Sequence, residues 1–177
     1  STYSYTIMLT TFLAGLTAGA WLGTRLARPG ADPILPVALC QLLIGVTTFL
    51  GLFTAGEPPY LYHLIHDAFS PSPRGMLLTQ LLLASGVMLV PTIGLGAMFP
   101  LTIGGLGLTG ERAPGLVARA YSWNTCGAIA GSVAAGFWLI PIIGSRNVLI
   151  TGIVVNLLVA TVGLLATGPA GLPRDRR

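Results

Sequence analysis

Long uninterrupted runs of apolar residues dominate the sequence, and short clusters of Arg, Pro and Gly separate them. About 20 apolar residues are enough for an α-helix to cross the hydrocarbon core of a bilayer. The pattern therefore predicts five membrane-spanning helices, over residues 5–24, 33–55, 76–108, 114–143 and 147–167. The expected fold class is an all-α, polytopic transmembrane helix bundle over residues 1–167, followed by an Arg-rich tail over 168–177.

The third run is longer than one straight crossing requires, and its second half contains Pro91, Gly94, Gly96 and Pro100. Each Pro removes a backbone donor and clashes with the preceding turn. Irregular backbone at membrane depth needs cover from protein or a water-filled cavity. We therefore expect a kinked or tilted helix that packs on its neighbours.

The segment 58–69, between the second and third runs, has a different pattern. Its apolar residues recur at helical spacing and are Leu61, Leu64, Ile65, Ala68 and Phe69. This predicts a short amphipathic helix in the plane of the membrane interface. His63 and His66, with Asp67 beside them, have a spacing that could hold a metal ion. No third ligand is evident, so we expect titratable interface residues and no metal site.

The distribution of Arg predicts the orientation of the chain. Two Arg residues, Arg74 and Arg146, fall on one side of the predicted membrane. The other side has seven, which are Arg25, Arg28, Arg112, Arg119, Arg174, Arg176 and Arg177. Because basic residues concentrate in cytoplasmic connections, we expect a multi-pass protein of the inner (plasma) membrane with a cytoplasmic C-terminus.

Composition narrows the class of protein further. Charged residues make up 8% of the chain, against about 25% in soluble domains, which excludes a water-soluble enzyme. The net charge of +4 does not indicate a nucleic-acid partner, because the Arg residues form no stripe. Cys40 and Cys126 lie in apolar runs, which predicts small buried side chains and no disulfide framework.

Small residues at four-residue steps predict helix faces that can approach each other closely. They are Gly15, Gly19 and Gly23 in the first run, and Gly127, Gly131 and Ala135, with Ala128, Ser132 and Gly136 beside them, in the fourth. Lipid provides no hydrophobic drive for helix association, so contact depends on faces without bulk. We expect both rows to form helix–helix seams, either within this bundle or with a partner chain.

Polar chemistry inside the runs is sparse, and no Asp, Glu, Lys or His is expected at mid-depth. Ion-coupled transport depends on such groups, so active transport is disfavoured, as is haem ligation by a buried His. Arg119, Tyr121 and Asn124 form a candidate polar site near the cytoplasmic start of the fourth run. The alternative is an Arg that reaches the interface and an Asn that bonds a neighbouring helix. We predict no catalytic residues and no cofactor.

Three stretches carry a family resemblance. They are Ser4-Tyr5 with Gly15, Gly19 and Arg25; Pro91-Thr92 with residues 96–101; and Tyr121, Asn124-Thr125, Gly127-Ala128, Gly131-Ser132, residues 135–137, residues 139–141 and Gly144. Together they resemble the membrane domain of bacterial spermidine-synthase-like proteins, which are polyamine aminopropyltransferase-like integral membrane proteins. The resemblance implies a sixth span before Ser1 and a catalytic cytoplasmic domain after Arg177. It therefore transfers no catalytic residue to this chain.

We expect a non-catalytic membrane domain that anchors and packs. Its partners would be the lipid bilayer and either a fused cytoplasmic spermidine-synthase-like domain or the other subunits of a membrane complex. The alternative is a carrier or binding protein for a small neutral or lipid-like molecule, with a plan similar to half of a major-facilitator transporter. A cavity lined by Thr92, Asn124 and Asn156 would favour the carrier, and a solid interior would favour the scaffold.

Overall fold

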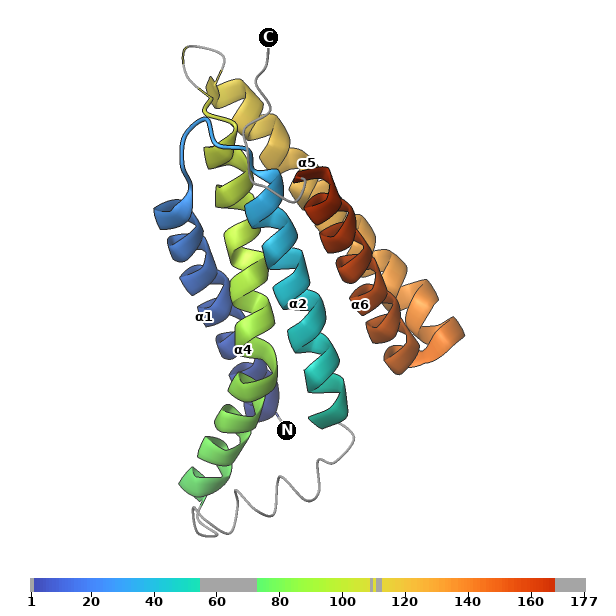
Figure 1. Cartoon of the computed structure of the whole chain (residues 1–177). Helices are drawn as coiled ribbons and strands as arrows, with labels where there is room; N and C mark the ends of the chain where they lie inside the picture. Colours follow the sequence, from blue (N-terminus) through green and yellow to red (C-terminus); the bar gives the residue numbers. More distant parts are fainter. Residues whose placement is uncertain (1, 55–72, 109, 111–112, 168–177) are drawn as a thin grey trace.

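The computed structural model describes residues 2–54, 73–108, 110 and 113–167, and all regular structure in these residues is helical. The helices are α1 (Thr2–Leu26), α2 (Ile34–Thr54), α4 (Pro73–Gly105), α5 (Ala113–Ala134), the π-helix η1 (Ala135–Leu139) and α6 (Ile140–Thr167) (Figure 1). The predicted all-α fold is confirmed for this part of the chain. The amphipathic helix predicted over 58–69 and the tail over 168–177 lie outside the described residues.

Four helical runs are long and apolar enough to cross a membrane: Tyr3–Leu26, Ile34–Phe53, Gly75–Gly105 and Ala113–Thr167. The last has 55 residues and would be about 80 Å long if straight, whereas the hydrocarbon core is about 30 Å thick. It is not straight, because Gly144 has φ 79° and ψ 156°, a conformation that glycine adopts readily. Gly144 lies inside α6, and most of α6 runs in the opposite direction to α5 (Figure 1).

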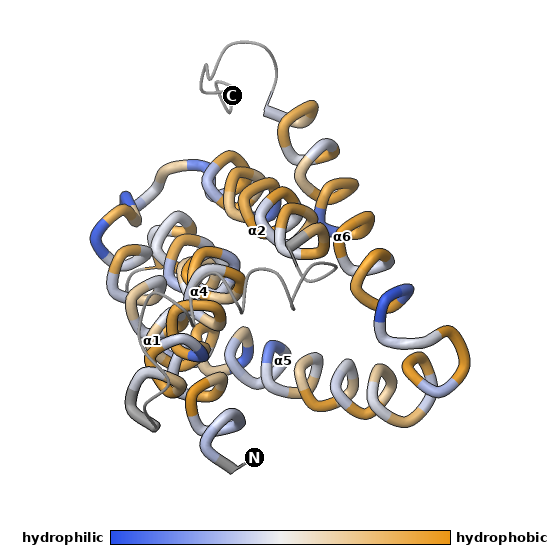
Figure 2. Tube along the Cα trace, turned by 90° about the horizontal axis from the view of Figure 1, so that it is seen from below, coloured by the Kyte–Doolittle hydropathy of each residue, from blue (hydrophilic) through white to orange (hydrophobic). Residues whose placement is uncertain are grey.

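The helices form a row in which α1 packs on α4, α4 on α2 and α2 on α6. Helix α5 stands apart from this row and contains no buried residue. It contacts α4 through the rings of Tyr121 and Phe99, which meet edge to face with centroids 5.9 Å apart. Seen end on, α5 and α6 diverge from the turn that joins them (Figure 2).

The outer surface of the bundle is apolar. Ile142 and Leu165 are each 77% exposed, and hydrophobic positions occur on all sides of the helices in Figure 2. Among the described residues, few apolar side chains are buried, and on average they are smaller than the exposed ones. They are Ala38, Ile44, Ala97, Leu101, Ile153 and Ala160. Helices that are apolar all round belong in a large core or in a membrane. Since these side chains face outward, the surface is that of a protein surrounded by hydrocarbon.

Proline shapes two of the helices. Pro91 and Pro100 lie inside the 33-residue α4, which is bent in Figure 1, in agreement with the kink expected over 76–108. Next to Pro91, the Thr92 hydroxyl donates to the carbonyls of Met88 and Leu89 at 2.8 and 2.9 Å, and such back-bonding favours bending. Before Pro141, the chain adopts the π-turn of η1, which no feature of the apolar pattern predicts.

Candidate functional site

The glycine row of α1 forms a close seam with α4. Gly15, Gly19 and Gly23 are all buried. A Cβ at Gly19 would lie 2.8 Å from the carbonyl carbon of Ile93, and a Cβ at Gly23 would lie 2.7 Å from the carbonyl oxygen of Ala97. Real Cβ atoms are essentially never found at such distances from backbone. The missing side chains therefore allow the two backbones to touch, as predicted for this row.

Glycines outside the four-residue rows also make close contacts, which the sequence analysis missed. A Cβ at Gly94 of α4 would lie 2.8 Å from Cγ1 of Ile44 on α2. Between α2 and α6, a Cβ at Gly45 would lie 2.8 Å from Cδ2 of Leu157. Gly45 stands between large residues, and Gly94 has no glycine four residues before or after it, so no four-residue step marks either one. In the sequence, Gly94 indicated only a kink.

The small-residue row of α5 has no such neighbour. A Cβ at Gly127, Gly131 or Gly136 would meet no side chain, and no backbone beyond its own helix turns, within 4 Å in the described chain. Ser132 is exposed, and its hydroxyl donates to the Ala128 carbonyl at 2.8 Å. The described residues therefore do not show this row packed inside the bundle, which was one of the two expectations. Contact with a partner chain stays a prediction.

The candidate polar residues of α5 do not converge on one site. Arg119, Tyr121 and Asn124 are all exposed. Successive residues of an α-helix are about 100° apart, so Arg119 points to the side of α5 opposite Tyr121. The Tyr121 ring rests against Phe99. These three side chains do not form a pocket. Their arrangement favours the alternative, in which each is a separate side chain near a membrane surface.

The residues proposed to line a carrier cavity are also separated. Thr92 is buried in the seam between α4 and α1. Asn156 donates from Nδ2 to the Gly152 carbonyl of its own helix at 2.7 Å, and Asn124 lies on α5. The structure has one cavity between α2 and α4 and another between α2 and α6, and none of these three residues lines either of them. The carrier alternative therefore has no support from the cavity on which it depended.

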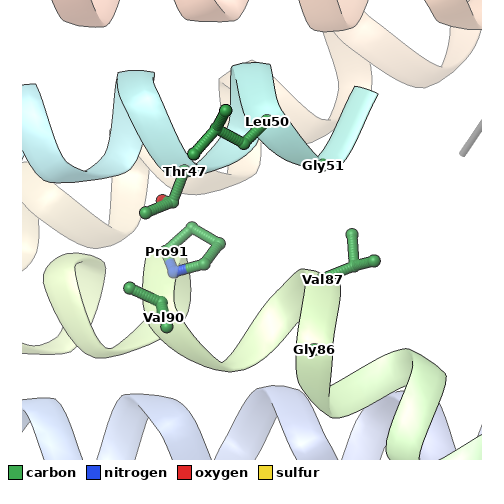
Figure 3. Close-up of a pocket in the computed structure, with 7 residues that line it drawn as sticks. All are labelled: Thr47, Leu50, Gly51, Gly86, Val87, Val90 and Pro91. Atoms are coloured by element: carbon green, nitrogen blue, oxygen red, sulfur yellow. The ribbon is translucent and has the colours of Figure 1, made fainter. Parts of the chain in front are cut away.

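A cavity of about 160 Å³ lies between α2 and α4 (Figure 3). Thr47, Leu50 and Gly51 line it from α2, and residues 86, 87, 90 and 91 line it from α4. The Thr47 hydroxyl donates to the Leu43 carbonyl at 2.6 Å, so it is already satisfied. No titratable side chain lines this cavity, so it has no acid, base or nucleophile. Its walls suit an apolar group.

Ionisable and thiol side chains elsewhere in the described residues do not form a cluster either. The described ranges contain no cluster of three His, Cys, Asp or Glu side chains that could bind a metal, and His63, His66 and Asp67 lie outside those ranges. Cys40 and Cys126 are free thiols. Cys40 is half-buried and Cys126 is exposed on α5, so the expectation that both thiols are buried is wrong. Helix α5 contacts α4 through Tyr121, and no described residue covers its face at Cys126.

Comparison with known proteins adds no family. No family model, curated protein or solved structure matches this chain. The resemblance to spermidine-synthase-like membrane domains therefore stays a prediction.

Proposed function

We propose that this chain is a non-catalytic, five-span membrane bundle that packs into a larger membrane assembly. The observation that carries the proposal is the contrast between two similar rows of small residues. The row of α1 is buried against α4, whereas Gly127 and Gly131 are exposed on α5, a helix without any buried residue. In a bilayer, a helix face of small residues allows the backbone of another helix to approach closely. The exposed face of α5 is therefore a suitable surface for a partner helix.

The proposed number of spans follows from the turn at Gly144. Divided there, the 55-residue run provides two crossings of about 24 to 31 residues, and each is long enough for a hydrocarbon core of about 30 Å. Together with α1, α2 and α4, this makes five.

The proposed orientation places the C-terminus in the cytoplasm of a bacterial cell, with the bundle in the inner membrane. Arg25 lies in the last turn of α1, Arg28 follows that helix, and Arg119 lies near the start of α5, whereas Arg146 lies near the start of α6. In Figure 1, the end of α1 and the start of α5 lie at one end of the bundle, and the start of α6 lies toward the other. At the first end, the Arg25 guanidinium carbon lies 4.7 Å from the centroid of the Trp21 ring. Trp and basic side chains together are typical of a membrane–water interface, which supports a cytoplasmic assignment for the end with more Arg.

Two forms of the assembly remain open under this proposal. In one, the bundle anchors a fused spermidine-synthase-like domain on the cytoplasmic side. In the other, it is an accessory subunit of a membrane complex. The mass of the intact natural polypeptide separates them, since a mass near 18.3 kDa supports the subunit and a much larger mass supports the fusion.

The assembly itself is tested by comparing two Gly→Leu variants of α5. Gly131→Leu places bulk on the small-residue row, and Gly115→Leu places the same bulk about 160° away around the helix. Neither residue has a neighbour within 4 Å, so both variants should fold normally. On blue-native gels of detergent-solubilised native membranes, we expect Gly131→Leu to reduce the large complex and Gly115→Leu to leave it intact. A wild-type chain that migrates alone, or equal behaviour of the two variants, would contradict the proposal.

A further inference from the structure

A second cavity, of about 370 Å³, forms a groove between α2 and α6. Ligand pockets commonly have volumes of about 300–1,000 Å³. On α6 the groove is lined by Arg146, Ile150, Ile153, Val154 and Leu157. These positions follow the spacing i, i+4, i+7, i+8 and i+11, so they lie on one face of the helix. The groove thus runs along α6, with a guanidinium at one end and a leucine at the other.

At the apolar end of the groove α2 and α6 are in close contact, and the two helices diverge toward the start of α6 (Figure 1). A Cβ at Gly163 would lie 2.8 Å from the Cβ of Ala38, and a Cβ at Gly45 would lie 2.8 Å from Leu157, so α2 and α6 are in close contact over this part. Further along α2, Phe49 and Phe53 line the groove, and their rings pack edge to face with centroids 5.0 Å apart. The divergence of the two helices therefore leaves a wedge with aromatic and aliphatic walls.

The length of the groove matches one leaflet of a bilayer. Arg146 and Leu157 are eleven residues apart, which is about 16 Å along a helix, and half of the hydrocarbon core is about 15 Å. Arg146 follows the turn at Gly144 by two residues and is exposed. With the turn at Gly144 between two membrane crossings, as proposed above, the guanidinium would lie at the depth of lipid headgroups and Leu157 near the middle of the membrane.

Arg146 has no acidic partner in the described part of the chain. Asp32 is the one acidic residue there, and it lies at the opposite end of the bundle, where its Oδ1 accepts from the backbone N–H of Ile34 at 2.9 Å. A guanidinium forms strong, directional hydrogen bonds with phosphate oxygens. The charge at the mouth of the groove is thus complementary to a phosphate.

We propose that this groove binds an anionic phospholipid, with one acyl chain between α2 and α6 and the phosphate on Arg146. The inference rests on the membrane embedding of the proposed function but on neither its partner nor its orientation. A free anion would meet a single exposed guanidinium, and such contacts contribute little in water. A lipid adds the apolar walls, so charge and shape together favour an amphiphile.

The charge is tested by titrating the full chain in detergent with phosphatidylglycerol or phosphatidylcholine and counting bound lipids by native mass spectrometry. A hydrogen-bonded charge pair corresponds to about a tenfold change in affinity. We expect Arg146→Gln to weaken phosphatidylglycerol binding about tenfold and to abolish the preference for this lipid over phosphatidylcholine. We expect Arg146→Lys to retain most of that preference. The matched control Arg119→Gln, an exposed Arg at the other end of the bundle, should bind like the wild type.

The groove is tested separately with Val154→Trp, which fills it without changing charge. Val159→Trp is the control, because residue 159 lies on the opposite face of α6 and is also exposed. We expect only Val154→Trp to weaken lipid binding, with helix content by circular dichroism unchanged. The proposal would be overturned by unchanged lipid binding in Arg146→Gln, or by equal losses of binding in the two Arg→Gln variants or in the two Trp variants. It would also be overturned if millimolar inorganic phosphate displaced the lipid. If Val154→Trp does not fold, the comparison of Arg146→Gln with Arg119→Gln decides alone. The assembly test on α5 is independent of all these outcomes.

Discussion

Replacing Gly19 by Ala places a methyl group against the backbone of α4. Its Cβ would lie 2.8 Å from the carbonyl carbon of Ile93 and 3.0 Å from the amide nitrogen of Ala97, with the Ile93 carbonyl oxygen closer still. Favourable separations between non-bonded carbon atoms are about 3.5–4.0 Å. Backbone atoms cannot rotate away as the end of a side chain can, so α1 and α4 must separate by about 1 Å.

Overpacking of a well-packed interior costs about 1–3 kcal/mol. We place Gly19→Ala at about 3 kcal/mol, the upper end of that range, because separation of the helices also loosens the contacts at Gly15 and Gly23. The matched control is Gly131→Ala, which has nothing within 4 Å. Ala is about 0.5–1 kcal/mol more favourable than Gly inside a helix, so the free energy of unfolding of Gly131→Ala should rise by no more than about 1 kcal/mol.

Both variants are measured by unfolding in dodecyl maltoside micelles with increasing amounts of sodium dodecyl sulfate. Far-UV circular dichroism reports helix loss. In a background in which Trp123 and Trp138 are replaced by Phe, the fluorescence of Trp21 reports the environment of α1. We expect a lower unfolding midpoint for Gly19→Ala and an unchanged or slightly higher one for Gly131→Ala. Equal midpoints, or a larger loss in Gly131→Ala, would show that the α1–α4 contact is not the close seam described above.

Two further predictions concern orientation and the attachment of α5. In a background in which Cys40 and Cys126 are replaced by Ala, Ser145→Cys should react with an impermeant thiol reagent added outside the cell, and Ala31→Cys should not; the reverse labelling would invert the proposed topology. Tyr121→Ala removes the ring contact with Phe99, which lies at 5.9 Å, and should cost about 1 kcal/mol. Hydrogen exchange should rise in α5 and not in α1, and an equal rise in both helices would show that this contact supports the whole bundle.

The apolar pattern predicts helices well because crossing a membrane imposes a minimum length on each run. Predicted bounds of 5–24 and 33–55 compare with α1 at Thr2–Leu26 and α2 at Ile34–Thr54. The turn at Gly144 falls between the predicted spans 114–143 and 147–167. The π-helix η1 before Pro141 was not predicted, because a single widened turn leaves no period in the apolar pattern.

Periodicity identifies a bare helix face but not the helix that covers it. The rows of α1 and α5 have the same four-residue step, yet Gly19 touches α4 while Gly131 touches nothing within 4 Å. The groove beside Arg146 was missed for a related reason. Its walls come from two helices that are distant in sequence, and only their divergence beyond Gly45 creates the space.

The seam between α1 and α4 also constrains how the protein can be made. The glycine row of α1 meets α4 only from Leu89 onward, so α4 cannot cover this face while the intervening residues are still being synthesised. Helix α1 must wait in the bilayer, together with α2, until the second half of α4 has left the ribosome and entered the membrane. During that interval the exposed glycines can pair with any other small-faced helix nearby, which makes the speed of insertion of α4 a determinant of correct assembly.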